Sequence, residues 1–541
     1  MKIAAAVLLF ALVCGCTKIG STGEGQRRNA FTQPHALRYA AIGDVTTLNP
    51  MLSQELVQSF MGSMTAAWLC KYDRSNKPVP ELATEIPSQR NGGISADGKT
   101  ITYHLRSGVK WSDGAPFGAD DVLFTTKLIL DPHTNVTSRD GWDRIVTLGA
   151  PNQKTVVFRL REPYSPFLPT FFCSAGANPS ILPKHLLQHT SDINKDPYNS
   201  KPVGIGPFRY VEWRRGDRVI MEANPYYFRG MPKLKRVEFK IVPNRDTLVA
   251  AMQTGDVDLW PIAARAYYPR LQALPGFTVS RHVGLAYGHL DINQSHPVLS
   301  DVRVRHALVL AIDRRYLIAK VAHGIGILQD SAVSPASKFF DRAIVTTPYD
   351  PVFARRLLDA AGWRLGRDGI RAKNGVKLSV FFVSNAGSPD TDTLIELIRG
   401  WWKNVGVELV RKNYDVALLF AQPANGGILA TGKFDAAIFA TFPAPNGDLS
   451  AAFACAQAPP NGQNYVHYCN PAADAAMRDF KLTYDLNRQK RDSFVAQEQI
   501  ARDYPLAINY ISEDLFAYNA DLKNFHPNAV TPFDDMLNVD I

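Results

Sequence analysis

Hydrophobic and polar positions recur with two different periods along the chain, and this pattern predicts a mixture of strands and helices. Strands are expected where the alternation has period two, over residues 101–105 and 237–242. Helices are expected where apolar residues follow an Asp or Asn start signal, over 122–130, 247–253, 301–312 and 352–361. Because the two kinds of segment alternate without an internal repeat, the pattern predicts a mixed α/β architecture.

Length and charge narrow the class of protein. The chain has 541 residues, of which 46% are hydrophobic and 20% charged. This composition is typical of a folded protein, and the length predicts roughly two to four domains. The long apolar run lies within the first fifteen residues, which excludes an integral membrane protein. The net charge is +10, but no run of Lys and Arg reaches five, so we expect no nucleic-acid partner.

The amino terminus has the layout of an export signal. Residues 1–15 carry one cation and then an apolar stretch too short to span a membrane, which predicts a signal peptide. The sequence Val-Cys-Gly-Cys that ends at Cys16 resembles a lipobox, in which the Cys is acylated and becomes the first residue. An ordinary signal peptide with an incidental Cys is the alternative. Residues 16–35 are expected to form a lipidated, flexible tether, so the sequence predicts an exported protein anchored by lipid to a bacterial membrane, in the periplasm or on the outer cell surface.

Four cysteines remain once the signal peptide and the lipidation site are set aside. An oxidising compartment favours pairing them. Cys455 and Cys469 flank a loop signal, Pro-Pro-Asn-Gly, and we expect them to form a disulfide. Cys70 and Cys173 are the possible second pair, although the sequence alone does not show that they meet.

The catalytic and metal-binding motifs that we sought are all incomplete. His185 and His189 share a helical face, but the Glu of a zinc-protease motif is missing. Ser107 and Lys110 have the spacing of a β-lactamase nucleophile motif without its companion boxes. The Gly-Ile-Gly segment at 204–206 lacks the third Gly of a dinucleotide-binding loop. We therefore expect no metal, no cofactor and no enzymatic activity.

Several short sequence blocks follow one another in a fixed order. The most specific is LRSGVKWSDGAPF at 105–117 with ADDV at 119–122. The other blocks are LRY at 37–39, TTLNP at 46–50, PVGIGPF at 202–208, NPYY at 224–227, GDVD at 255–258, DVRVRHAL at 301–308 and AIDR at 311–314. Together they resemble the family 5 extracellular solute-binding proteins, the oligopeptide- and dipeptide-binding receptors of ABC importers. The resemblance runs from about residue 36 to residue 541.

The resemblance implies a two-lobed fold like that of periplasmic binding proteins, with mixed sheets, an extra inserted domain and a ligand cleft between the lobes. Domain I would comprise residues 36–80, 201–284 and 513–541, domain II the insertion 81–200, and domain III residues 285–512. Two chain crossings, near 286–289 and near 514–516, would form the hinge. A solute that contacts both lobes would then favour the closed form.

The resemblance also implies which residues line the cleft. They are Thr47 and Leu48 from domain I, and Phe442, Ala444, Asn446 and Asp448 from domain III. Peptide binders of the family carry W-x-x-D in domain III, and its Asp pairs with the peptide ammonium; here Thr441 and Ala444 stand in these two positions. Because a buried ammonium without a carboxylate is unfavourable, we expect weak binding of peptides with a free amino end unless Asp448 replaces the missing Asp.

The function implied by the resemblance is delivery of a peptide or peptide-like solute to the permease subunits of an ABC transporter. Two alternatives stay open: a receptor of the same fold for a non-peptide solute, and a sensory or scaffold lipoprotein without a transport role. An exported hydrolase that uses the same cleft is disfavoured because the catalytic motifs are incomplete. The sequence does not name the solute.

Overall fold

The computed structural model describes residues 29–541 except 54, 137, 138, 140, 175–178, 444 and 531. The predicted signal peptide, the lipidation site Cys16 and the start of the tether lie outside the described residues, as does Ala444. Within the described part of the chain, no helix combines the length and apolar character needed to cross a membrane.

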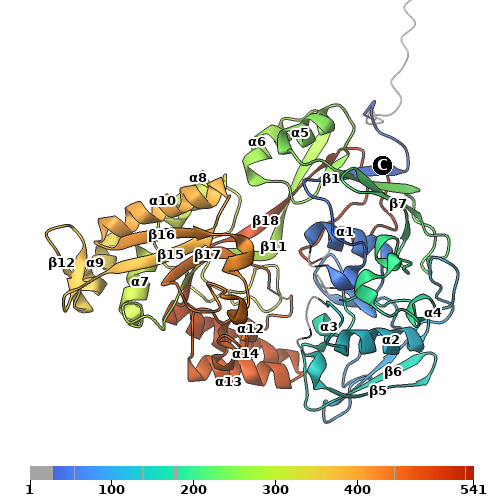
Figure 1. Ribbon diagram of the computed structural model, residues 1–541, viewed down its shortest axis with the longest axis horizontal. Coiled ribbons are helices and arrows are strands. Elements are labelled where there is room, and N and C mark those ends of the chain that lie inside the picture. The colour runs from blue at the N-terminus through green and yellow to red at the C-terminus, as the bar shows by residue number, and fades with distance from the viewer. Residues whose placement is uncertain are drawn as a thin grey trace, which may run out of the picture.

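A mixed sheet of ten strands extends through both halves of the molecule (Figure 1). In spatial order its strands are β16 (Glu408–Tyr414), β15 (Ser379–Asn385), β17 (Ala436–Thr441), β11 (Phe277–Ile292), β18 (Leu506–Asn519), β10 (Leu259–Trp260), β1 (Ala36–Ala41), β9 (Arg236–Ile241), β8 (Arg218–Ala223) and β7 (Phe208–Arg214). The long central strands β11 and β18 belong to both halves. We call residues 29–284 with 513–541 the first lobe, and residues 285–512 the second lobe.

The antiparallel pairing of β11 with β18 is interrupted where the chain passes from one lobe to the other. Val283 lies opposite Glu513, whereas the next pair is Tyr287 opposite Ile511, so β11 contains extra residues at this point. A β-bulge of this kind bends a strand and increases its local twist. It lies beside both predicted chain crossings, and the assignment of a hinge here stays a prediction.

The two largest hydrophobic cores of the first lobe are formed by different sets of residues. One lies against β1, β7, β8 and β9 and includes Tyr39, Phe208, Phe239 and Phe533. The other lies mostly within the segment predicted as an insertion, where Trp111 and Phe158 are fully buried, and it also includes Met51, Ala67, Leu69 and Ile205. The remaining elements of this lobe are α1 (Leu56–Thr65), β2 (Cys70–Tyr72), β3 (Pro78–Pro80), β4 (Thr100–His104), α2 (Ala119–Leu130), β5 (Ile145–Asn152), β6 (Thr155–Leu160), α3 (Phe167–Thr170), α4 (Lys184–Leu187), α5 (Arg245–Gln253) and α6 (Tyr268–Gln272). Because the second of these cores includes residues from both sides of the predicted boundary, the division into domains I and II stays a prediction.

The second lobe packs helices against β15, β16 and β17 around a core that includes Trp402 and Phe382. The indole N–H of Trp402 donates to the carbonyl of Leu308 at 3.1 Å, so this buried polar atom is satisfied. The other elements of the lobe are α7 (Val302–Leu310), α8 (Arg314–Lys320), α9 (Pro351–Ala360), β12 (Arg364–Leu365), β13 (Arg371–Lys373), β14 (Val376–Lys377), α10 (Pro389–Asn404), α11 (Val416–Leu419), α12 (Ser450–Phe453), α13 (Pro471–Leu482) and α14 (Leu486–Asp503).

The strands and helices expected from periodicity are confirmed as β4, β9, α2, α5, α7 and α9, with bounds shifted by one to three residues. Their start signals act through side-chain caps. Asn244 accepts from the N–H of Thr247, which satisfies one of the free N–H groups at the start of α5. Asp301 and Asp350 cap α7 and α9 in the same way.

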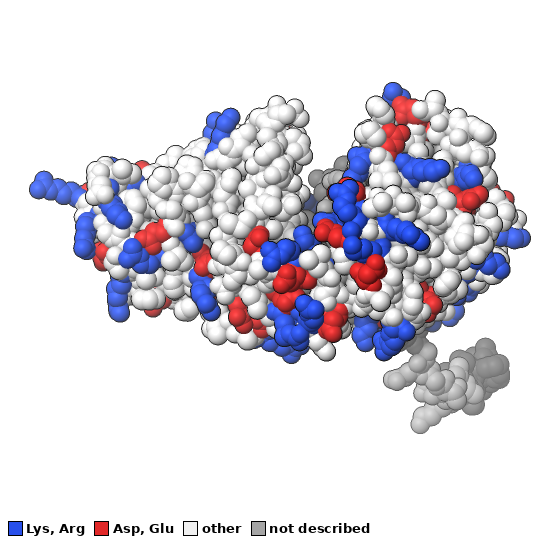
Figure 2. All heavy atoms as spheres, turned by 90° about the horizontal axis from the view of Figure 1, so that it is seen from below, with Lys and Arg blue, Asp and Glu red and all other residues white. Residues whose placement is uncertain are grey.

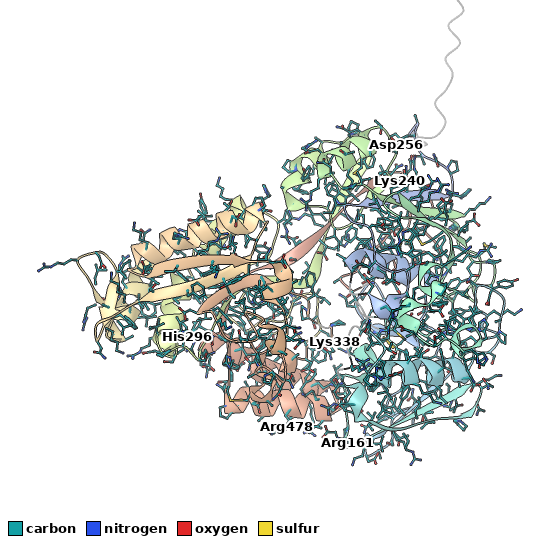
Figure 3. The ribbon with its side chains drawn as sticks, viewed as in Figure 1. Arg161, Lys240, Asp256, His296, Lys338 and Arg478 are labelled. Atoms are coloured by element: carbon teal, nitrogen blue, oxygen red, sulfur yellow. A yellow bond between two sulfur atoms is a disulfide. The ribbon has the colours of Figure 1, made fainter. Side chains whose placement is uncertain are left out.

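A second contact joins the lobes at the lower end of the molecule in Figure 1, away from β11 and β18. Tyr484, between α13 and α14, donates its hydroxyl to the carbonyl of Gly98 at 3.0 Å and accepts from the N–H of Tyr164 at 3.1 Å. The N–H of Ser165 donates to the carbonyl of Lys481 at 2.7 Å. The hydroxyl of Ser165 donates to the carbonyl of Phe480 at 2.9 Å. Arg161 and Arg478, labelled in Figure 3, lie on the two sides of this contact.

Both expected cysteine pairs lie close together in the structure. The Cα atoms of Cys455 and Cys469 are 4.7 Å apart, and those of Cys70 and Cys173 are 4.5 Å apart. The first pair closes a loop between α12 and α13, and the second links β2 to the chain after α3.

Candidate functional site

A notch separates the two lobes on one face of the molecule. Figure 2 shows it in a space-filling view, with Lys and Arg interspersed with Asp and Glu on the surrounding surface. Figure 1 shows β11 and β18 passing from one lobe to the other. A solute in the notch would contact both lobes.

Three parallel strands of the second lobe end on the side that faces the first lobe (Figure 1), and we call their ends the second-lobe wall. β15 is parallel to β16 on one side and to β17 on the other, and the three strands end at Asn385, Tyr414 and Thr441. In open sheets with parallel strands, ligands bind beyond the carboxyl ends of the strands, where the loops diverge. Thr441 also pairs with Tyr287 of β11, which places the end of β17 next to the crossing between lobes.

The loop that follows β17 carries most of the predicted second-lobe contacts. The side chain of Phe442 is 77% exposed, although a large aromatic side chain is usually buried. Asn446 accepts from the N–H of Asp448 at 3.2 Å, and Asp448 accepts from the N–H of Ser450 at 2.9 Å. One carboxylate oxygen of Asp448 therefore already binds the backbone at the start of α12. Ala444 lies outside the described residues, so its ligand contact stays a prediction.

The first-lobe residues Thr47 and Leu48 differ in what they expose. Leu48 is fully buried in the core, and its N–H donates to the carbonyl of Asn199 at 2.9 Å. Its side chain is therefore part of the packing in this structure, and its ligand contact stays a prediction. Thr47 is half-buried, and its hydroxyl donates to the same carbonyl at 3.2 Å.

Thr47 also lines a polar hollow of about 360 Å³. The hollow is lined by Thr46, Thr47, Leu52, Asn135, Asn194, Lys195, Asp196, Asn199, Ser200 and Arg215. All of these residues belong to the first lobe, so a molecule bound there would contact one lobe only. The hollow is therefore a poorer candidate for a closing solute than the notch.

A hydrogen-bonded chain beside the end of β17 was not anticipated from the sequence. Asp291 and His289 of β11 lie 2.7 Å apart between Oδ1 and Nδ1, and His289 Nε2 lies 2.9 Å from Thr441 Oγ1. The side chains of His289 and Asp291 are 5% and 8% exposed. The sequence does contain one indication of the His289–Asp291 pair: the two residues are two positions apart, and side chains with that spacing in a strand point to the same face.

The crossing strands carry a largely buried carboxylate. Burial raises the pKa of Asp514 to about 6, and the Arg265 cation acts in the opposite direction. Arg265 donates to the hydroxyls of Tyr510 and Ser512, at 3.2 and 3.0 Å, and stacks over the Tyr510 ring. The guanidinium is therefore held against β18.

Comparison with known proteins identifies the family. Residues 77–461 match the family described as bacterial extracellular solute-binding proteins, family 5. The oligopeptide-binding protein AppA of Bacillus subtilis is 27% identical over 98% of this chain and 96% of its own length. The nickel-binding periplasmic protein of Escherichia coli is 25% identical over 71% of this chain and 72% of its own. The structure of Bacillus subtilis AppA in complex with a nonapeptide has a TM-score of 0.76 at 24% identity, covering 93% of this chain and 98% of that chain.

The chain belongs to the family 5 bacterial extracellular solute-binding proteins. The expected family and the two-lobed mixed α/β fold are thereby confirmed. The protein is an extracytoplasmic solute-binding receptor, and its relatives are receptors of the same kind.

Proposed function

We propose that this receptor binds a peptide or peptide-like solute in the notch between its lobes and presents it to the permease subunits of an ABC transporter. The observation that carries the proposal is the wall built from the ends of β15, β16 and β17 beside the crossing strands. It is supported by AppA of Bacillus subtilis, which shares the fold over nearly its whole length and is solved with a nonapeptide.

Mass spectrometry of the purified native protein tests this proposal directly. A retained peptide, released on denaturation, is the expected result, and calorimetry with di-, tri- and pentapeptides should then give saturable binding. A retained metal complex or other non-peptide solute, with no peptide binding, would contradict it. The nickel-binding relative makes that second outcome the competing function, and the absence of the expected Asp at position 444 favours it.

Recognition of the amino end is the second element of the proposal. With Ala at position 444, an ammonium would have to lose water without gaining the expected carboxylate, a loss of about 3–5 kcal/mol for a buried pair. We expect peptides with a free amino end to bind weakly, and acetylation to leave binding unchanged or better. Tight binding that is lost both on acetylation and in Asp448→Ala would identify Asp448 as the anchor instead.

Lipid anchoring at Cys16 is the third element. The lipobox-like sequence supports acylation of this Cys and retention at a membrane. Cys16→Ser should move the protein from the membrane fraction to the soluble extract of a bacterial host, while Cys14→Ser should leave it in place. Retention of the Cys16→Ser protein would contradict the anchor.

A further inference from the structure

The directions of the hydrogen bonds in the chain Asp291–His289–Thr441 depend on which nitrogens of the His289 ring carry a proton. A carboxylate has no proton to donate, so the Nδ1–H of His289 donates to Asp291. In the neutral imidazole, Nε2 is then an acceptor. A ring protonated on both nitrogens would donate to Thr441 Oγ1, whereas towards a neutral ring the hydroxyl of Thr441 donates its single proton to Nε2, 2.9 Å away. The lone pairs of Thr441 Oγ1 are left as acceptors.

The surroundings hold His289 in this orientation. Its ring lies 4.4 Å from that of Phe439 and 5.1 Å from that of Tyr287, measured between centroids. His289 and Asp291 are both buried. Buried polar groups that are fully paired keep one arrangement, because any other would leave a donor or acceptor without a partner.

Thr441 is the member of the chain that can contact a solute. It is half-buried, it is the last residue of β17, and the exposed ring of Phe442 follows it. Its pairing with Tyr287 places it beside the crossing between the lobes. It also stands where peptide binders of the family carry the Trp of W-x-x-D, next to the position where the ammonium-pairing Asp is missing.

We propose that Thr441 is a specificity-determining residue that accepts a hydrogen bond from an N–H of the bound peptide, and that His289 and Asp291 set it in this role. In the arrangement that we propose, the Thr441 proton is committed to His289, and Thr441 then cannot donate to a carbonyl or carboxylate of the solute. A neutral acceptor here suits an amide N–H, for which no buried charge needs compensation. This inference rests on the proposed peptide function and specifies which peptide group is recognised.

The test uses peptide probes in which single N–H groups are removed. Pentaalanine, its amino-acetylated form and analogues with one backbone N–H replaced by an ester oxygen are titrated into the full-length protein by calorimetry. Against the native protein, we expect one replacement to weaken binding by about three- to tenfold, as for a lost hydrogen bond. In Thr441→Val, the parent peptide should weaken by a similar factor, and the penalty for that one replacement should disappear.

Thr441→Ser is the matched control, since it keeps the hydroxyl and should keep both the affinity and the penalty. Thr441→Ala repeats the loss of the hydroxyl if the Val variant does not fold, and thermal melting verifies each variant. Equal weakening of all probes in Thr441→Val, with the penalty intact, would show a purely structural role and overturn the inference while peptide binding stands. If no probe binds the native protein, both the peptide function and the inference fail.

Discussion

The two stretches that contain the site residues expected from the resemblance, residues 44–49 and 442–448, are built differently. The first is held by bonds to other parts of its lobe: Asp44 accepts from the N–H of Gly216 at 2.8 Å, and Asn49 donates to the side chain of Asn199 at 2.8 Å. The second bonds within itself and to the start of α12, its carbonyls accept from the hydroxyls of Ser337 and Ser493 at 3.4 Å, and it exposes Phe442. The first loop is therefore fixed by folding, whereas the second presents side chains that can change with little effect on stability. Solute choice is expected to reside in the second.

The largest effect should come from the first loop. Leu48→Ala removes a fully buried side chain and should lower the free energy of unfolding by about 2–5 kcal/mol. Peptide affinity of the folded protein should stay unchanged, because the side chain contacts the core. Denaturant unfolding and calorimetry measure the two quantities. Leu56→Ala is the matched control, since Leu56 is 47% exposed. A loss of peptide affinity in Leu48→Ala without a loss of stability would show that the first loop serves binding rather than folding.

The disulfide next to the second loop should have the next largest effect. Cys455 and Cys469 close a loop of 14 residues just after α12. Replacing both by Ser should lower the free energy of unfolding by about 3 kcal/mol on the chain-entropy account. It should also weaken peptide binding, since α12 is bonded to Asp448. Non-reducing peptide mapping of the native protein provides the check, and two free thiols would contradict this prediction.

The strands β11 and β18, which connect the two lobes, should make stability depend on pH. The pKa of Asp514 is raised to about 6 in the folded protein, so the native state binds its proton more tightly than the unfolded chain does. The resulting stabilisation is present below about pH 4 and is lost as pH rises through about 6. Asp514→Asn should remove about 2–3 kcal/mol of this pH dependence. If the free energy of unfolding of Asp514→Asn changes with pH between 4 and 6 as steeply as that of the native protein, this prediction is contradicted.

The smallest effect on stability should come from Phe442. Phe442→Ala should change the free energy of unfolding by less than about 0.5 kcal/mol, since the side chain is exposed. Peptide affinity should nevertheless fall by about three- to tenfold, because an aromatic side chain at the wall can bury a large area against a solute. Val345→Ala, at an 85% exposed position of the same lobe, is the control. Equal affinity of the two variants would remove Phe442 from the site.

Local signals predicted the fold well because they act over a few residues. Asp301 and Asp350 marked the starts of α7 and α9 correctly, since a capping side chain bonds within its own first turn. The site was harder, because it depends on contacts between distant segments. The family resemblance places Leu48 in a ligand-binding loop, and that contact stays a prediction; its burial cannot be read from the loop, because it arises from the packing of the whole first lobe. Local sequence patterns do not identify His289 as a site residue, because its partner Thr441 is 152 positions away in the chain.

The Tyr484 contact changes how strongly a solute must bind in order to hold the lobes together. A receptor that is mostly open when empty loses apparent affinity in proportion to the small fraction of molecules that are closed. The four hydrogen bonds around Tyr484 join the lobes through protein groups alone. At about 1 kcal/mol net, a single such bond raises the ratio of closed to open molecules roughly fivefold. If these bonds form only when the lobes close, the empty receptor starts closer to its binding-competent population, and less of the solute's intrinsic affinity is used to close it.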